Sequence, residues 1–336
     1  MQRDDAIGKR RTPAECEANG QHDARENGGL GRNDARNGDG ASGRDGAFLK
    51  DDAFVPVPPG GGLPAWLAVA AWRDKPGLDA VTAGMSLRRG GVSAGPWASL
   101  NVALHVGDDP AAVAENRRRL SLAAGFAPDA WTCAEQTHEN RVKRVTAADR
   151  GAGRLARETA FPATDAMVTN EPGILLAAFF ADCVPLLFLD PENLAVGVAH
   201  AGWRGTARGV ARAVIAAMKE AFGTRPEQLL AAIGPSIGPC CYEVDETVAR
   251  AVGVPEAVRK AGGRANGRFM LDLKEANRQF MIKEGLAPNH IEVSRYCTRC
   301  RTDLFFSHRG EGGRTGRMAA FIGIRHVGRR NTVVVS

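Results

Sequence analysis

Residues 174–205 read ILLAAFFADCVPLLFLDPENLAVGVAHAGWRG, and this stretch decides the fold. Two apolar runs, 174–180 and 184–189, are followed by a turn over 190–193 and by a third apolar run over 194–199. Short apolar runs bounded by Pro, Gly, Asn and Asp are typical of buried strands. The stretch therefore predicts three strands in succession.

A helix is predicted directly after the third strand. Val210, Val214, Met218 and Phe222 are spaced four residues apart, which places them on one apolar stripe of a helix. Thr206 precedes this stripe and is the expected N-cap.

A second helix is predicted to begin at Pro110. Asp109 is a good N-cap, and proline suits the first helical position because it has no N–H to leave unpaired. From Trp66 onward, short apolar runs alternate with segments of helical periodicity. The expected fold class is therefore α/β, in the sense of a mixed α+β domain with a mixed sheet and flanking helices.

The chain divides into two regions by composition. Residues 1–46 contain Ile7 and Leu30 but no Val, Phe, Trp or Tyr, so they cannot bury enough apolar area to offset the entropy of ordering. A Pro- and Gly-rich stretch from Pro56 to Pro64 closes this region. We expect a disordered extension over 1–60 and one domain over 61–336.

The composition argues against some classes of protein but does not identify the activity. With 44% hydrophobic residues and a mean hydropathy of −0.23, the 336-residue chain resembles an ordinary soluble globular protein. Its longest apolar run is shorter than the roughly 20 residues of a spanning helix, and no apolar signal segment follows the basic Lys9-Arg10-Arg11. Seven cysteines, an odd number, favour reduced thiols. We expect no membrane partner and a cytoplasmic location.

The chain carries a modest positive charge. The net charge of +6 and the pI of about 9.1 attract anions in general. The basic clusters are not interleaved with aromatic residues, as a surface that stacks bases would be. We therefore expect no nucleic-acid partner.

Two histidines and one cysteine stand where predicted strands end. His200 closes the third strand, Cys183 lies between the first two, and His138 follows an apolar segment that begins at Trp131. Two imidazoles and one thiolate can bind a metal with one coordination position open, as catalytic zinc prefers. Each residue taken singly also fits a packing role. The Gly-rich turn beside Arg204 suggests an anion site, or simply a tight connection between strand and helix.

Four further cysteines suggest a second metal site but have poor spacing for one. Cys297 and Cys300 form a CxxC pair, whereas Cys240 and Cys241 are adjacent. Adjacent side chains of a strand point to opposite faces, so we expect these four thiols not to converge on one ion.

A series of motifs resembles the YfiH, or laccase-domain, family over residues 66–326. The series is specific because its members occur in the right order. The matching stretches are residues 88–93, 99–101, 105–110, 135–138, 181–185, 199–205, 233–244, 297–298, 305–309 and 315–318. The positions around Glu139 and Met85 depart from the family pattern, which affects the expected substrate contacts more than the metal site.

The resemblance implies a fold, a metal and a reaction. It implies one α/β domain and a zinc ion bound by His138, Cys183 and His200. The family is described as purine nucleoside phosphorylases that act on adenosine, inosine and methylthioadenosine with phosphate, with some adenosine deaminase activity. Some members are linked to peptidoglycan editing. Purine nucleosides and phosphate are thus the expected partners.

Substrate and catalytic residues are expected among the shared motifs. Arg88, Asn101 and Arg204 are expected to bind substrate, with the two arginines and the helix start holding phosphate. For deamination, zinc would lower the pKa of a bound water, and Asp182 is the nearest carboxylate in sequence to carry the proton. Hydrogen bonding within its turn is an equally good role for Asp182.

Three other readings remain open from the sequence. Cys183 and a histidine could form a metal-free nucleophilic hydrolase that edits peptidoglycan precursors. The protein could instead be a non-enzymatic binding module in which the zinc is structural, with His105 or Cys133 as fourth ligand. Copper polyphenol oxidation, the family's earlier description, ranks third, because no two histidines have His-x-His spacing and only Met167 lies near Cys183 in sequence as an axial ligand.

Overall fold

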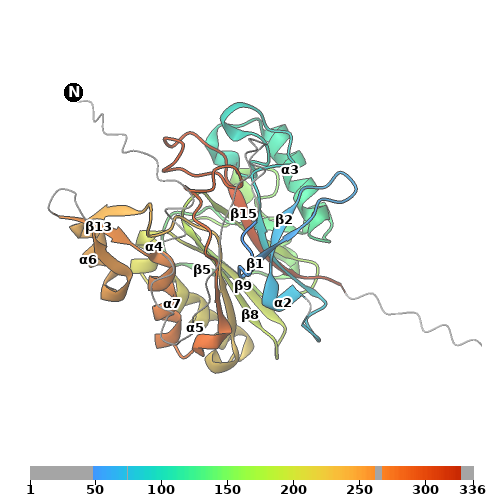
Figure 1. The fold of residues 1–336 in the computed structure, drawn as a ribbon. Helices are drawn as coiled ribbons and strands as arrows, with labels where there is room; N and C mark the ends of the chain where they lie inside the picture. Colours follow the sequence, from blue (N-terminus) through green and yellow to red (C-terminus); the bar gives the residue numbers. More distant parts are fainter. Residues whose placement is uncertain (1–47, 74, 262–266, 327–336) are drawn as a thin grey trace, which may run out of the picture.

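The computed structural model describes residues 48–73, 75–261 and 267–326, and within them two six-stranded sheets form the body of the protein (Figure 1). The first sheet has the order β1 (Phe54–Val57), β2 (Trp66–Val69), β3 (Val81–Ser86), β15 (Met318–Ile324), β7 (Leu175–Phe180) and β4 (Trp131–Cys133). The second has the order β14 (Ile291–Val293), β10 (Leu230–Ile233), β8 (Val184–Asp190), β9 (Ala195–Ala201), β6 (Ala166–Thr169) and β5 (Val142–Arg144).

Both sheets are mixed, and smaller elements surround them. Parallel pairs join β4 to β7, β10 to β14 and β5 to β6, and the remaining neighbours are antiparallel. A third sheet has the order β11 (Glu243–Asp245), β13 (Arg268–Leu271) and β12 (Val258–Lys260). The α-helices are α2 (Ala70–Arg73), α3 (Pro110–Ala123), α4 (Trp203–Ala207), α5 (Val210–Phe222), α6 (Glu246–Val252) and α7 (Leu273–Lys283).

Short 3-10 helices occur in the connections between these elements. They are η1 (Gly95–Trp97), η2 (Leu104–Val106), η3 (Pro128–Ala130), η4 (Ala147–Asp149), η5 (Arg157–Thr159), η6 (Pro226–Gln228), η7 (Pro255–Ala257) and η8 (Pro288–His290).

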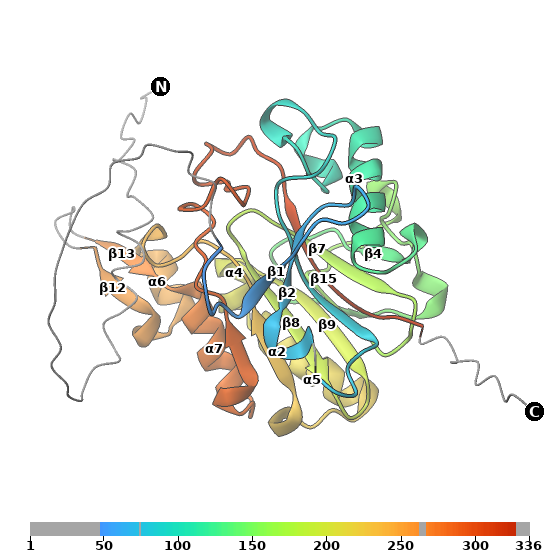
Figure 2. The ribbon, with the colours of Figure 1, turned by 45° about the vertical axis from the view of Figure 1, so that its right-hand side comes forward.

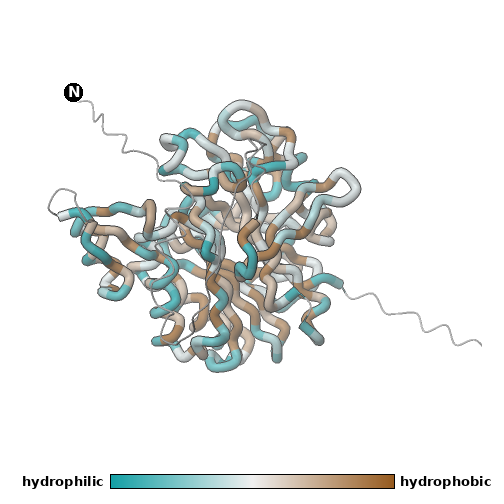
Figure 3. Tube along the Cα trace, in the orientation of Figure 1, coloured by the Kyte–Doolittle hydropathy of each residue, from teal (hydrophilic) through white to brown (hydrophobic). Residues whose placement is uncertain are grey.

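The two large sheets pack face to face between outer helices. Alternate residues of β7 point to opposite sides, so Leu176 and Phe180 enter the core between the sheets, whereas Leu175 and Phe179 pack toward α3. The second sheet shows the same alternation of side chains. One face contributes to the core between the sheets, and the other face packs against α5 and α7. Figure 2 shows α3 on one side of the sheets and α5 and α7 on the other, and in Figure 3 the hydrophobic segments gather along the strands.

The structure confirms the mixed α+β class and the predicted strand order in residues 174–205. Strands β7, β8 and β9 form there, and β8 and β9 make a hairpin around residues 190–193. Periodicity did not reveal that β7 belongs to the first sheet while β8 and β9 belong to the second. The chain crosses between the sheets at residues 181–183.

The two predicted helices form, but one start differs. The α3 helix begins at Pro110 with Asp109 as N-cap, whose side chain accepts from the Ala111 N–H. The expected N-cap role of Thr206 is wrong, because α4 ends at Ala207 and α5 is preceded by Gly209 in the left-handed conformation. The Thr206 hydroxyl instead accepts from the Asn277 side-chain amide.

The ordered region begins before residue 61. Residues 54–57, which composition assigned to the extension, form β1 and pair with β2. Phe54 is fully buried, and the Asp52 carboxylate accepts from the Ser294 hydroxyl and the Arg295 N–H. Residues 1–47 lie outside the described part of the chain, so disorder there stays a prediction. Across the described segments, none of the helices combines the length and apolarity that a membrane crossing requires.

Candidate active site

A cavity of about 620 Å³ opens where the chain passes from the first sheet to the second. Its wall is built by the segment after β4, the crossover between β7 and β8, the end of β9, and α4. Such a volume is typical of small-molecule sites. The lining residues with polar or aromatic side chains include His105, Arg117, Glu135, Gln136, His138, Arg157, Phe179, Asp182, Cys183, His200, Trp203, Arg204, Tyr242, His308, Arg309 and Arg317.

His138, Cys183 and His200 converge on this cavity. Their ligand atoms all lie within 4.8 Å of one another, and the two imidazole rings have centroids 4.8 Å apart. His200 is buried at the end of β9, and Cys183 follows the crossover. His138 has a positive φ of 64°, an uncommon conformation for a residue other than glycine. The three residues thus meet as the strand-end argument proposed.

One carboxylate, which the sequence analysis missed, organises this trio. Asp165 Oδ1 lies 2.8 Å from His200 Nδ1 and accepts from the His138 N–H at 3.0 Å. Its other oxygen accepts from the N–H groups of Thr137 and Glu139 at 3.0 and 2.8 Å. Because a carboxylate can only accept, Nδ1 of His200 carries a hydrogen, and Nε2 is the ring nitrogen that can bind a metal once it is deprotonated. Asp165 stands directly before β6, and its sequence context gave no signal.

The protonation states in the trio are coupled. Burial alone would raise the pKa of the Cys183 thiol, but the charges of His200 and His138 and their hydrogen bonds to the thiol lower it to about 6. Burial would likewise lower the pKa of His200, but the Cys183 thiolate and the Asp165 carboxylate raise it to about 9. Burial opposes ionisation of Asp165 as well, yet hydrogen bonds from His200 and backbone N–H groups hold its pKa below the usual value.

The donor set fits a zinc ion. One thiolate and two imidazoles are ligands that zinc accepts, and three protein ligands leave a fourth position for substrate or water. The carboxylate that orients His200 is the kind of outer partner that metal-binding histidines have. Gly202 keeps space open beside the trio, because a Cβ there would lie 3.1 Å from both Cys183 Sγ and His138 Cδ2. Within the described residues, the group contains neither His105 nor Cys133.

Asp182 lines the cavity, and its carboxylate already accepts three hydrogen bonds. Oδ1 accepts from the hydroxyls of Thr298 and Ser307 at 2.6 and 2.7 Å, and Oδ2 accepts from the Arg309 N–H at 2.7 Å. Its backbone has a φ of 88°, a strained conformation, and its carbonyl accepts from the Ile237 N–H. These partners lie in residues 298–309, so the Asp182 side chain joins its turn to a distant segment and does not bond within the turn, which was the alternative role that the sequence left open.

Two of the expected substrate residues do not line the cavity. Arg88 donates to the carbonyls of Thr302 and Phe305, pairs with Glu311 at 3.0 Å and covers the Phe306 ring. Asn101 is fully buried, and its side chain bonds in part within its own loop. Shared motif residues therefore include positions that hold loops together, and a motif alone does not separate these from substrate contacts.

Arg204 does line the cavity, together with arginines that the sequence analysis did not select. Its guanidinium lies 4.4 Å from the centre of the Trp203 ring. Arg309 and Arg317 come from the segment before β15, and Arg117 from α3. Arginines outnumber the lining carboxylates of Glu135 and Asp182, so the cavity favours anions. The helix start beside Arg204 belongs to the five-residue α4 and not to α5, and its expected contribution to phosphate binding stays a prediction.

Aromatic and histidine side chains complete the wall. Phe179 stacks with Trp131 and meets the edge of His105. Burial, followed by the charges of Arg317, Arg157 and Arg117, lowers the pKa of His105 to about 4. Burial, with the charge of Cys183, raises the pKa of Tyr242 to about 12. His105 is therefore a neutral imidazole and Tyr242 a neutral phenol near pH 7. His308 lines the same cavity.

The expectation that the other four cysteines would not converge is wrong. Cys240, Cys241, Cys297 and Cys300 have thiol sulfurs that all lie within 4.8 Å of one another. Cys240 and Cys241 lie in a turn, not a strand, because the N–H groups of Cys241 and Tyr242 both bond to the Gly238 carbonyl. Consecutive side chains in such a tight turn do not alternate between opposite faces as in a strand.

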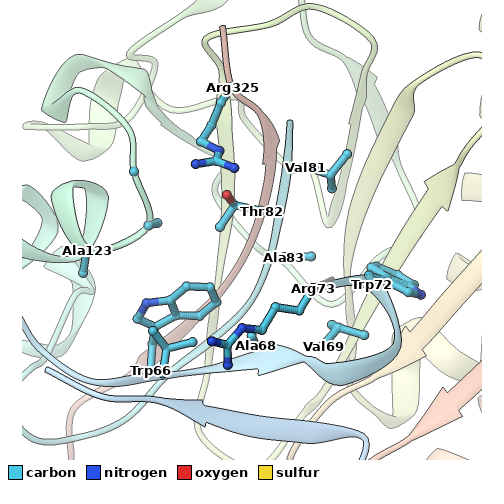
Figure 4. Close-up of a pocket in the computed structure, with 13 residues that line it drawn as sticks. Trp66, Ala68, Val69, Trp72, Arg73, Val81, Thr82, Ala83, Ala123 and Arg325 are labelled. Atoms are coloured by element: carbon cyan, nitrogen blue, oxygen red, sulfur yellow. The ribbon is translucent and has the colours of Figure 1, made fainter. Parts of the chain in front are cut away.

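A smaller depression of about 230 Å³ lies between β2, β3 and the end of α3 (Figure 4). Trp66, Trp72, Arg73 and Arg325 border it, together with aliphatic residues and Thr82. Its lining contains no histidine, cysteine or carboxylate, so it lacks the reactive side chains that line the larger cavity.

Comparisons with known proteins agree with this architecture. Residues 82–325 match the family model for multi-copper polyphenol oxidoreductase laccase. The purine nucleoside phosphorylase YlmD of Geobacillus stearothermophilus is 46% identical over 263 residues, which cover 77% of this chain and 94% of the relative. The purine nucleoside phosphorylase YfiH of Escherichia coli is 36% identical, covering 76% of this chain and 98% of the relative.

Two solved structures have a similar fold. The crystal structure of YlmD from Geobacillus stearothermophilus superposes with a TM-score of 0.75 at 43% identity, and the match covers 82% of this chain and 99% of that one. A Bacillus licheniformis structure described as a hypothetical protein YfiH superposes with a TM-score of 0.73 at 41% identity, over 78% of this chain and 97% of that one.

Proposed function

The chain belongs to the multi-copper polyphenol oxidoreductase laccase family, which includes YlmD and YfiH, and we propose that it is a zinc-dependent purine nucleoside phosphorylase. Its expected substrates are adenosine, inosine and methylthioadenosine, each cleaved with phosphate to a free base and a ribose 1-phosphate or its methylthio analogue. The observation that carries the proposal is one cavity that combines the His138, Cys183 and His200 trio with a cluster of arginines.

The proposed reaction exchanges one bond at the ribose. A phosphate oxygen forms a bond to C1′ while the bond from C1′ to the purine nitrogen breaks, and the electron pair leaves with the purine, which takes up a proton. Arg204, Arg309 and Arg317 bind and orient the phosphate by charge-assisted hydrogen bonds. Zinc bound by the trio would supply a Lewis acid with an open position, which stabilises developing negative charge.

The remaining wall binds the nucleoside and excludes water. Phe179 and Trp203 offer apolar ring surface to a purine. The neutral imidazole of His105 offers one hydrogen-bond donor and one acceptor, and neutral Tyr242 offers a hydroxyl. Adenosine deamination is a second expected activity of this cavity. Because three donors already occupy the Asp182 carboxylate, we propose that Asp182 positions the wall and does not carry the proton.

The proposal is tested by incubating the full chain, loaded with zinc, with adenosine in the presence and absence of phosphate. Chromatography should show adenine only with phosphate, and inosine if deamination also occurs. We expect His138→Ala to lose the bound zinc and to lower the rate by at least about 100-fold, the upper end of what removing an outer partner costs. His290→Ala is the matched control, because His290 ends a 3-10 helix and does not line the cavity. Full activity of His138→Ala would overturn the proposal.

Phosphate binding is tested separately. Arg204→Ala should raise the KM for phosphate with a smaller effect on the KM for adenosine, since the lost guanidinium would have paired with the anion. Arg212→Ala is the control, because Arg212 pairs with Glu284 on the outer helices. An unchanged KM for phosphate would remove Arg204 from this role.

One observation favours a second candidate function. A Cys183 thiol with a pKa near 6 beside an imidazole with a pKa near 9 is the ion pair that a nucleophilic cysteine hydrolase uses. Such an enzyme would act without metal on an amide of a peptidoglycan precursor. Chelation separates the candidates, because it abolishes the phosphorylase and spares the hydrolase. Copper oxidation stays third, and Met167 does not line the cavity.

A further inference from the structure

The four cysteines outside the trio form a compact group between two segments distant in sequence. Cys240 and Cys241 lie in the turn before β11, and Cys297 and Cys300 follow β14. The Cys300 sulfur lies 3.7 Å from that of Cys240 and 3.4 Å from that of Cys241. Cys241 and Cys297 are buried, and the other two are half-buried.

These separations match a tetrahedral thiolate site. Zinc–sulfur bonds of about 2.3 Å place the four sulfurs of a tetrahedral site about 3.8 Å apart. The observed sulfur pairs are close to this edge length, and all four sulfurs lie within 4.8 Å of one another. A small adjustment of side-chain rotamers would therefore seat one ion at the centre.

The backbone around the group also suits thiolates. The Gly238 N–H donates to Cys297 Sγ at 3.2 Å, which is a bond that stabilises a sulfur carrying negative charge. A Cβ at residue 238 would lie 3.2 Å from Cys297 Cβ and 3.3 Å from Cys240 Sγ, so glycine permits this close approach. Four sulfur ligands in this geometry favour zinc over the hard cations magnesium and calcium.

We propose that Cys240, Cys241, Cys297 and Cys300 bind a second zinc ion, which joins the two segments that form one wall of the active-site cavity. The segment after β10 supplies Ile237 and Tyr242 to that wall, and the segment after β14 supplies His308 and Arg309. The two segments already meet at one bridge between Ser236 and Cys297. Four protein ligands close the coordination sphere, so this zinc is structural.

Zinc binding to the four cysteines exchanges protons for the metal ion and involves no redox step. Each thiol releases its proton to solvent as its sulfur bonds to the ion, so a fully protonated group releases four protons per zinc and no electrons are transferred. The inference does not depend on the phosphorylase reaction, because the ion would stand outside the cavity lining.

The test measures zinc per chain in the purified full-length protein by elemental mass spectrometry. We expect two zinc ions in the unaltered chain, one in His138→Ala, and one in the double variant Cys297→Ser with Cys300→Ser. Cys133→Ser is the control, since Cys133 is buried outside both groups and should keep two. One zinc in the unaltered chain that disappears in His138→Ala would overturn the proposal.

X-ray absorption keeps the test decisive if the double variant does not fold. The zinc that remains in His138→Ala should show a shell of four sulfurs at about 2.3 Å with no nitrogen. A mixed nitrogen and sulfur shell, a metal other than zinc, or a disulfide within the group found by mass spectrometry without reduction would each contradict the assignment.

Discussion

Asp165 bonds to both histidines of the trio, although it does not line the cavity. It fixes the ring of His200 through Nδ1 and the unusual backbone of His138 through its N–H. Second-sphere carboxylates of this kind set the tautomer of a ligand histidine and increase its affinity for metal. Asp165 is therefore a positioning residue for the proposed zinc.

We expect Asp165→Asn to weaken zinc binding by about 10- to 100-fold, the usual cost of losing an outer partner. An amide offers only one acceptor oxygen, so it cannot satisfy the five donors that meet the Asp165 carboxylate. Competition with a chromophoric chelator measures the affinity. Asp190→Asn is the control, because Asp190 is also a buried carboxylate that closes a turn, at the far end of β8. Equal affinity in both variants would contradict the role.

The thiol of Cys183 should titrate at low pH in the metal-free protein. Thiolate is the reactive form and exists above the pKa, so alkylation by iodoacetamide should increase with pH around a midpoint of about 6. Peptide mass spectrometry identifies the modified residue, and added zinc should protect it. Burial raises the pKa of Cys133, so that thiol should stay unmodified and serve as control. A Cys183 midpoint near the ordinary 8.5 or so would contradict the coupling with the imidazoles.

At the scale of elements, the crossover between β7 and β8 determines where the cavity forms. Asp182 lies in this crossover and accepts from Thr298, Ser307 and Arg309, which belong to the segment between β14 and β15. One turn therefore joins both sheets to a cavity wall. The positive φ at Asp182 persists because these bonds hold it.

We expect Asp182→Ala to lower the free energy of unfolding by about 3 kcal/mol, because it removes the acceptor of three hydrogen bonds and leaves buried donors unpaired. Urea unfolding followed by fluorescence measures the change. Asp303→Ala is the control, because Asp303 pairs with Arg301 in the same segment and is less buried. If Asp182→Ala were as stable as the control, the turn would not depend on this carboxylate.

The sequence predicted the local elements of this region better than their assembly. Short continuous apolar runs identified β7, β8 and β9, and the strand ends pointed to His200 and Cys183. Periodicity reports which face of a strand is apolar, not which sheet the strand joins. The split between the sheets, and the convergence of the four cysteines, depend on contacts between distant segments.

The site residues were likewise predicted only in part. The trio was found because strand ends and a family motif coincide there. Arg88 and Asn101 were expected to bind substrate, but they hold loop segments together, whereas Arg309 and Arg317 reach the cavity. All four lie in or beside shared motifs, so only the folded arrangement distinguishes them.

At the scale of the whole molecule, the two sheets share one core that extends to the chain's first described residues. Phe48 and Leu49 pack against this core, and Phe54 is buried in it. The free energy from burying one such aromatic side chain is about 1.5–3 kcal/mol. The domain thus needs residues that composition alone assigned to the extension.

Truncation tests this boundary. A chain that begins at residue 48 should keep its Tm, because residues 1–47 have the composition of a disordered segment. A chain that begins at residue 61 should melt several degrees lower, since it loses β1 and the buried Asp52. Differential scanning calorimetry compares the two. Equal melting temperatures would show that β1 contributes nothing to stability.

The central claim is that the cavity transfers the ribose of a purine nucleoside to phosphate. Phosphorus NMR of the zinc-loaded full chain with adenosine and inorganic phosphate tests this most directly. The account predicts that a ribose 1-phosphate signal grows at the expense of phosphate, in step with adenine, and that both stop when a chelator is added. Release of adenine with free ribose and unchanged phosphate, or no release from a zinc-loaded protein, would contradict it.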